Sequence, residues 1–180
     1  MPSLVLMTDD ERLADPLAAA RVLPRGSMVV ARSRDAGRLS ELSRSLLKIA
    51  RRHGLAVLIA GDPLLAGRLG ADGFHLPGAR AGEAAHWRAR FPTMMITASA
   101  HSYRALSTMR NAPVDAIFLS PVFFTKSHPD KAVPPPSRTN LIARAAGKPV
   151  YALGGVDARN ARLLAPGVFA GIAAIGALAV

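Results

Sequence analysis

The chain has 180 residues and no cysteine, which excludes disulfides, thiolate metal sites and a cysteine nucleophile. Half of its residues are hydrophobic, so one domain spanning residues 1–180 can bury a sizeable core. With 23 Lys and Arg against 12 Asp and Glu, the net charge of +11 suits an anionic partner, either nucleic acid or phosphorylated small molecules.

The arginines are spread singly or in pairs over segments with helical patterns. They form no stripe interleaved with aromatic residues and match no helix-turn-helix or zinc-finger pattern, which favours phosphorylated small molecules over nucleic acid. The apolar stretch 168–180 is too short and too rich in Ala and Gly to span a bilayer, and no secretory signal pattern is present. We therefore expect a cytoplasmic protein without a membrane partner.

Short apolar runs alternate with helical patterns along the chain. Runs such as AVLIA and AIFLS indicate strands buried on both faces, as in a parallel sheet covered by helices. The eight predicted strands are Leu4–Thr8, Ser27–Arg32, Ala56–Ala60, Gly73–Leu76, Met94–Ser99, Ala116–Ser120, Val150–Leu153 and Gly171–Ile175. The seven predicted helices are Leu13–Leu23, Ala36–His53, Pro63–Leu69, Gly82–Arg90, Ser102–Met109, Arg138–Ala146 and Asp157–Leu164.

Eight alternations of strand and helix predict an α/β fold, a closed TIM (β/α)8 barrel, with an open doubly wound sheet as the alternative. The chain is shorter than the roughly 200 residues usual for such barrels. Its eighth predicted strand lies close to its last residue. We therefore expect the last covering helix to be truncated or missing, and a homodimer would cover the exposed face.

Polar residues and glycines follow the predicted strands, and in a parallel barrel such positions form the functional face. Gly154, Gly155 and Gly176 follow the last two strands, where backbone amides can hold a phosphate or form an ordinary tight turn. Arg32 and Arg34 can clamp a diphosphate or lie on the surface. Asp62 can bind Mg2+ or cap the helix that begins at Pro63.

The histidines allow further chemistry at this face. His75 alternates with apolar neighbours, which is typical of a histidine inside the barrel. His101 and His128 fall in loops and can serve as acid–base groups. The proline-rich segment 124–138 is either a functional loop over the barrel mouth or a surface loop.

Several blocks in register resemble the thiamine-phosphate synthase and thiazole tautomerase (TenI-type) superfamily. They are LVLMTD at 4–9, LAVLIAGDPLLAGRLGADGFHLPG at 55–78, ITASAHS at 96–102, DAIFLSPVFFTKSHP at 115–129, YALGGVDARNARLL at 151–164 and GIAAIGAL at 171–178. The resemblance implies a TIM barrel in thiamine biosynthesis. It also implies a transferase that joins hydroxymethylpyrimidine diphosphate to thiazole phosphate and releases diphosphate with the help of Mg2+.

The resemblance also implies roles for individual residues. Arg32, Arg34, Ser99 and His128 match catalytic positions, although His128 replaces a lysine of the family. Asp62 matches a Mg2+ ligand. The phosphate-binding positions are Thr125, Ser127, Gly154, Gly155 and Gly176.

Other positions depart from the family pattern. Val30 replaces a glutamine, Gly61 an asparagine and Gly176 a serine, and Pro121 aligns with the catalytic histidine of the tautomerase. Arg80 replaces the second Mg2+-binding carboxylate, and its charge would repel the metal. Three hypotheses stay open: a synthase, a TenI-like isomerase with His101 or His128 as the base, and a non-catalytic binder of a phosphorylated thiazole or related ligand.

Overall fold

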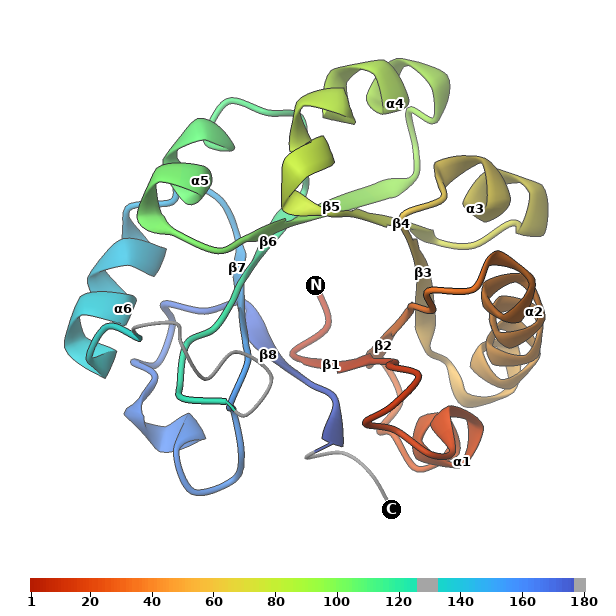
Figure 1. Ribbon diagram of the computed structural model, residues 1–180, viewed down its shortest axis with the longest axis horizontal. Helices are drawn as coiled ribbons and strands as arrows, with labels where there is room; N and C mark the ends of the chain where they lie inside the picture. The colour runs from red at the N-terminus through yellow and green to blue at the C-terminus, as the bar shows by residue number, and fades with distance from the viewer. Residues whose placement is uncertain (126–132, 177–180) are drawn as a thin grey trace.

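The computed structural model describes residues 1–125 and 133–176. Eight parallel strands form a closed barrel in sequence order, with β8 paired to β1 (Figure 1). The strands are β1 (Leu4–Met7), β2 (Met28–Ala31), β3 (Ala56–Ala60), β4 (Gly73–Leu76), β5 (Met95–Ala100), β6 (Ala116–Leu119), β7 (Val150–Leu153) and β8 (Gly171–Ala174). The predicted TIM barrel is confirmed, and the open doubly wound alternative is wrong because the sheet has no free edge.

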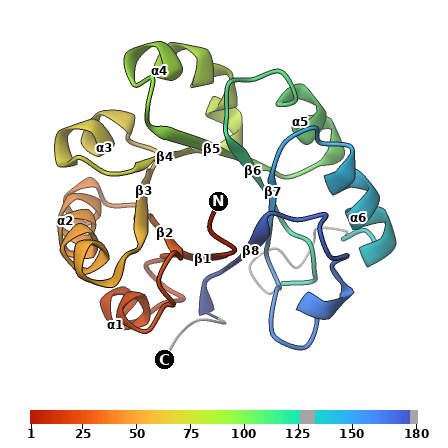
Figure 2. The same cartoon turned by 180° about the vertical axis from the view of Figure 1, so that it is seen from behind.

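The helices surround the barrel as an outer layer, seen from both ends in Figures 1 and 2. They are α1 (Pro16–Arg21), α2 (Ala36–His53), α3 (Pro63–Leu69), α4 (Ala84–Arg90), α5 (Tyr103–Thr108) and α6 (Pro136–Arg144). Two 3-10 helices complete it, η1 (Gly78–Glu83) and η2 (Ala161–Leu163). In α2, Leu39, Leu46 and Ala50 face the barrel, and Gly54 ends the helix with φ +65°, so the predicted bounds Ala36–His53 are confirmed.

The expected helix Asp157–Leu164 is wrong. Asp157 accepts hydrogen bonds from the backbone N–H groups of Arg159 and Asn160, and Asn160 Oδ1 accepts one from the Asp157 N–H. These local bonds compete with helical ones, so the segment makes a turn and only the short η2. The expectation of a truncated or missing final helix concerns residues 177–180, which lie outside the described residues.

The core has two layers. The side chains between the barrel and its helices form the larger cluster, which includes Ile59, Phe74 and Ile96. A second cluster fills the barrel, where the rings of Phe118 and Tyr151 lie 4.9 Å apart. The barrel is therefore a packed core, and ligands are confined to its ends.

The N-terminal residues lie inside the ring of strands in both end views (Figures 1 and 2). The Tyr151 hydroxyl donates a 2.7 Å hydrogen bond to the Pro2 carbonyl, so the amino end of the barrel is closed by the chain itself. This leaves the carboxyl ends of the strands as the open face. Within the described residues, no helix is long and apolar enough to cross a membrane.

Candidate functional site

A cavity of about 370 Å³ opens at the carboxyl ends of the strands. Its floor is apolar, with Met7, Ala60 and Leu153, and its walls carry seven polar side chains from the ends of five strands and the loops that follow them. The polar side chains that line it are Arg12, Arg32, His75, Ser99, His101, Ser120 and Thr125. The predicted clustering of polar residues at this face is therefore present among the described residues.

Two arginines at this mouth share one carboxylate. Asp9 follows β1, and its Oδ2 accepts hydrogen bonds from Arg12 Nη2 at 2.7 Å and Arg32 Nη1 at 2.6 Å. Its Oδ1 accepts the backbone N–H groups of Glu11 and Arg12. The hydrogen bond from Arg12 lowers the pKa of Asp9 far below its usual range, against the opposing effect of burial. Asp9 is therefore a fixed anion that holds two guanidinium groups.

His75 lies inside the barrel at the base of the same cavity. Its Nδ1 is 2.9 Å from the Thr97 hydroxyl and its Nε2 is 2.7 Å from the Ser99 hydroxyl. Burial lowers the pKa of His75 to about 4, with smaller contributions from the charges of His101 and Arg32. The imidazole is therefore neutral near pH 7, and it fixes the position of the Ser99 hydroxyl at the cavity wall.

His101 directly follows β5 and lines the same cavity. Its Nδ1 lies 2.9 Å from the Ser120 carbonyl oxygen, which can only accept a hydrogen bond. The neutral imidazole therefore carries its proton on Nδ1 and its lone pair on Nε2. This tautomer leaves a proton acceptor on a side chain that lines the cavity.

A second cavity of about 390 Å³ adjoins the first at the ends of β7 and β8. Gly154 and Gly155 form its turn with φ values of +88° and +68°. The Gly154 carbonyl accepts the Phe123 N–H and the Gly155 carbonyl accepts Asn160 Nδ2. Because the peptide is trans, the N–H groups of Gly155 and Val156 point away from these partners, and backbone donors so arranged can hold an anion.

The two cavities share five lining residues, which places their contents side by side. The shared residues are Arg12, Thr125, Leu153, Gly154 and Ile175. The second cavity also contains the predicted Gly155 and Gly176. Ser127 and His128, two further predicted site residues, lie outside the described residues.

The carboxylates near this face do not fit a Mg2+ site. Asp62 caps α3 by accepting the Leu65 N–H at 2.8 Å, one of the two interpretations that the sequence allows. Arg80 Nη1 donates to the Gly61 carbonyl, and Nε and Nη2 bind both oxygens of Glu83 at 2.7 Å. The charged group beside Asp62 is therefore the Arg80 guanidinium, which would repel a metal ion. Among residues 1–125 and 133–176, no group of three or more acidic or histidine side chains could hold a metal ion.

Arg34 lies apart from the other predicted site residues. Its side chain is 73% exposed and pairs with Glu11 at 2.7 Å, and it lines neither cavity. Strand β2 ends at Ala31, so the alternation of side chains between the two faces of a strand does not extend to Arg34. Arg32 is the arginine of this pair that reaches the cavity.

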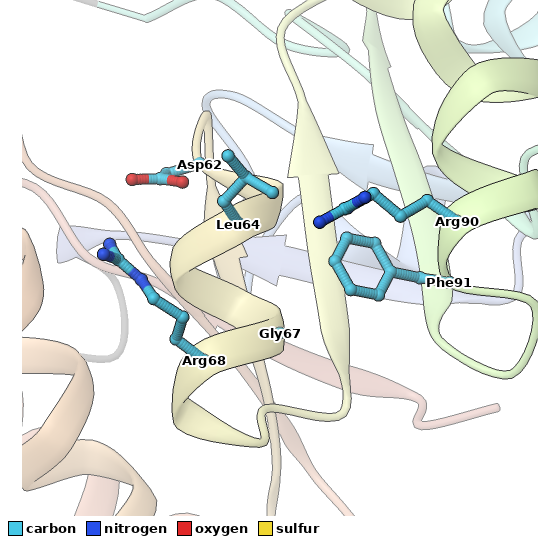
Figure 3. Close-up of a pocket in the computed structure, with 6 residues that line it drawn as sticks. All are labelled: Asp62, Leu64, Gly67, Arg68, Arg90 and Phe91. Carbon is cyan, nitrogen blue, oxygen red and sulfur yellow. The ribbon is translucent and has the colours of Figure 1, made fainter.

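A separate hollow of about 460 Å³ lies on the outer surface between α3 and α4 (Figure 3). Arg68 lies on α3, and the side chains of Arg90 and Phe91 point toward this helix from the end of α4. Phe91 packs against Gly67, where a Cβ would lie 2.7 Å from the ring, and the Arg90 guanidinium lies 5.7 Å from the ring centroid. This hollow shares no lining residue with the two mouth cavities, so we place the candidate site at the mouth.

Sequence reasoning missed Arg12, Asp9 as its partner, and Thr97. Arg12 falls five residues beyond the end of β1, in a stretch that reads as a polar loop before a helix. The sequence TDDER places an acidic residue three positions before an arginine, a spacing at which the two can pair in a turn. This pattern alone does not predict that the pair lies at the cavity.

Comparison with known proteins gives one family. A family model described as thiamine monophosphate synthase matches residues 4–178. The thiamine biosynthesis bifunctional protein ThiM/ThiE of Symbiobacterium thermophilum is 35% identical over 141 residues, covering 77% of this chain and 29% of that protein. The thiamine-phosphate synthase of Lysinibacillus sphaericus is 28% identical over 142 residues, covering 77% of this chain and 65% of that protein. This chain thus spans less than two thirds of either relative.

Solved structures agree on the fold. Thiamine phosphate pyrophosphorylase from Pyrococcus furiosus superposes with a TM-score of 0.77 at 22% identity, covering 96% of this chain and 85% of that one. KGPDC from Streptococcus mutans gives a TM-score of 0.65 at 13% identity, covering 97% and 88%. At these identities the likeness supports the barrel fold alone.

Proposed function

Because this chain belongs to the thiamine monophosphate synthase family, we propose that it joins hydroxymethylpyrimidine diphosphate to thiazole phosphate. The C–O bond to the diphosphate breaks, and its electron pair leaves with the diphosphate. The lone pair of the thiazole nitrogen then forms the new C–N bond, and the products are thiamine phosphate and diphosphate. The curated relatives, named for this activity or for thiamine biosynthesis, support the proposal.

The observation that carries the proposal is the pair of adjoining cavities. A two-substrate transfer needs two anionic groups held side by side with the reacting atoms between them. The first cavity offers Arg12, Arg32 and Ser99 to the departing diphosphate. The second offers the Gly154–Gly155 turn and Thr125 to the thiazole phosphate.

Each residue has a defined task in this reaction. Arg32 and Arg12 neutralise the charge that develops on the leaving group. In the His75 tautomer with the proton on Nε2, His75 donates to the Ser99 hydroxyl, which then donates its own proton to the leaving group. Loss of diphosphate leaves positive charge on the pyrimidine fragment. The apolar floor formed by Met7 and Leu153 limits the access of water to this fragment. The family implies Mg2+, but the carboxylates described above do not fit that ion, so no step here depends on it.

The test is incubation of the purified protein with both substrates, followed by detection of thiamine phosphate. Product formation that requires both substrates supports the synthase. Absence of product, with intact substrates and a folded protein, contradicts it.

The tautomer of His101 favours one second candidate, an isomerase acting on a phosphorylated thiazole. His101 lines the cavity, and because its Nδ1 is held by the Ser120 carbonyl, its neutral ring offers Nε2 as the proton acceptor. Turnover of a thiazole phosphate without diphosphate release, lost in His101→Ala, would support this candidate. Unchanged turnover in that variant would eliminate His101 as the base.

A further inference from the structure

We propose that Arg12, Asp9 and Arg32 form a metal-independent anion clamp in which Arg12 contacts both phosphorylated groups. The identity of the two anions rests on the proposed function, but the clamp itself rests on the geometry of these three residues. We call this set the Asp9 clamp.

The position of Arg12 carries the proposal. It lies in the loop between β1 and α1 and lines both the 370 Å³ and the 390 Å³ cavities. Arg32 lines the first cavity from the end of β2. A cation placed between two anionic ligands lowers their mutual repulsion, so Arg12 is placed to let both bind together.

The anchoring of the two guanidiniums makes the clamp rigid. Asp9 is 7% exposed and receives both arginines on one oxygen, while backbone N–H groups occupy the other. The Arg12 and Arg32 side chains remain 42% and 38% exposed. Since a guanidinium carries five donors in a planar fork, the contact to Asp9 fixes the plane in which each arginine can meet phosphate oxygens.

The charges at the rim explain why a metal is not needed. Two guanidiniums and one carboxylate leave the clamp with one net positive charge in the cavity wall. A divalent cation that used Asp9 would have to displace both arginines, and at Asp62 it would face Arg80. Arg80 is itself fixed by Glu83 and the Gly61 carbonyl, so it cannot easily withdraw.

The test uses inorganic diphosphate as the probe, with binding measured by calorimetry and by the melting temperature. Titrations are run at constant ionic strength with EDTA and with Mg2+. We expect diphosphate to bind and stabilise the protein with EDTA present, and Mg2+ to leave Kd unchanged within about threefold. Binding that requires Mg2+ would overturn the proposal.

Three variants test the residues. Arg12→Gln should weaken diphosphate binding about 10- to 100-fold, the usual effect of losing a charged hydrogen bond. Arg21→Gln removes the same charge from the exposed end of α1 and should leave Kd within twofold. If the two variants weaken binding equally, the effect is general charge and the clamp is refuted.

Asp9→Asn separates anchoring from charge. The substitution makes the site more positive, so a purely electrostatic attraction predicts tighter binding. The clamp predicts weaker binding, because both arginines lose their common anchor. Circular dichroism establishes that the variant is folded, and Arg12→Lys, which keeps the charge without the planar fork, should bind with intermediate strength.

The outcomes for the clamp and for the proposed function are distinct. Diphosphate binding with EDTA that depends on Arg12, without any thiamine phosphate formation, would refute the synthase and support the clamp. Product formation with diphosphate binding that occurs only with Mg2+ would support the synthase and refute the clamp.

Discussion

The buried imidazole of His75 links the stability of the barrel to the chemistry at its mouth. It lies edge-on to Phe118, with ring centroids 4.9 Å apart, and contacts one hydroxyl with each nitrogen. Protonation would place a charge in this apolar environment and would turn both nitrogens into donors. The neutral ring is therefore part of the folded state.

This predicts a loss of stability in acid. The pKa of His75 is lowered from 6.5 to about 4, so between these values the unfolded chain binds a proton that the folded protein does not. The free energy of unfolding should therefore fall as the pH falls from 6.5 to 4, by roughly 3 kcal/mol from this group. Urea unfolding at several pH values measures it, and His75→Asn should show a flatter dependence. An equally steep dependence in that variant would assign the effect elsewhere.

Ser99 is expected to act on the reaction more than on binding of the ground state. Its hydroxyl is fixed by His75 and lines the first cavity. Ser99→Ala should lower kcat about 10²-fold with a smaller change in KM, as for loss of a donor to developing negative charge. Steady-state kinetics of thiamine phosphate formation measures both. A change confined to KM would show that Ser99 binds substrate and transition state equally.

The sequence predicted those single residues whose role depends on local neighbours. The adjacent Pro63 made an N-cap one of two interpretations of Asp62, and the interior position of His75 follows from strand alternation. The meeting of Asp9 and Arg32 could not be predicted in this way, because it depends on how β1 and β2 align in the barrel. Contacts of this kind appear only once the register is known.

At the level of the elements, the turn after β7 has the tightest steric requirement in the candidate site. Gly155 has φ +68°, and a Cβ there would overlap the carbonyl oxygens of Phe123 and Phe124. The turn therefore sets the position of the segment after β6, which contributes Thr125 to both cavities. A side chain would displace that segment before it touched any ligand.

Gly155→Ala should consequently weaken ligand binding in the second cavity at least tenfold and destabilise the protein by about 1–3 kcal/mol. Gly167→Ala is the matched control, because Gly167 has φ +72° but nothing within 4 Å of its Cβ position. Inorganic phosphate titration and thermal melting measure the two effects. Equal effects in both variants would attribute the change to backbone strain alone.

Element boundaries were predictable where apolar periodicity is strong. Helix α2 has the predicted bounds because it repeats apolar residues over 18 positions and ends at a glycine. The segment after β7 has only a few apolar positions of this kind. The side chains of Asp157 and Asn160 each accept a hydrogen bond from the backbone N–H of the other residue. Local polar bonds therefore outweighed a weak helical pattern there.

For the whole molecule, closure of the barrel depends on a close approach between β8 and the start of the chain. A Cβ on Gly171 would overlap the backbone of Ser3, whose carbonyl accepts the Ile172 N–H at 3.0 Å. Gly171→Ala should lower the free energy of unfolding by about 3 kcal/mol. Gly82→Ala, at a position with nothing within 4 Å, should change it by less than about 1 kcal/mol. A similar cost in both, measured by urea unfolding, would contradict this account of closure.

The pairing of the first strand with the last also constrains how the protein is made. β1 pairs with β8, and the Tyr151 hydroxyl reaches Pro2 across 149 positions of sequence. During synthesis, β1 emerges first and keeps an unpaired edge until residues 171–174 have left the ribosome. Such an edge can pair with another chain, so the nascent protein is most exposed to aggregation just before its last strand appears.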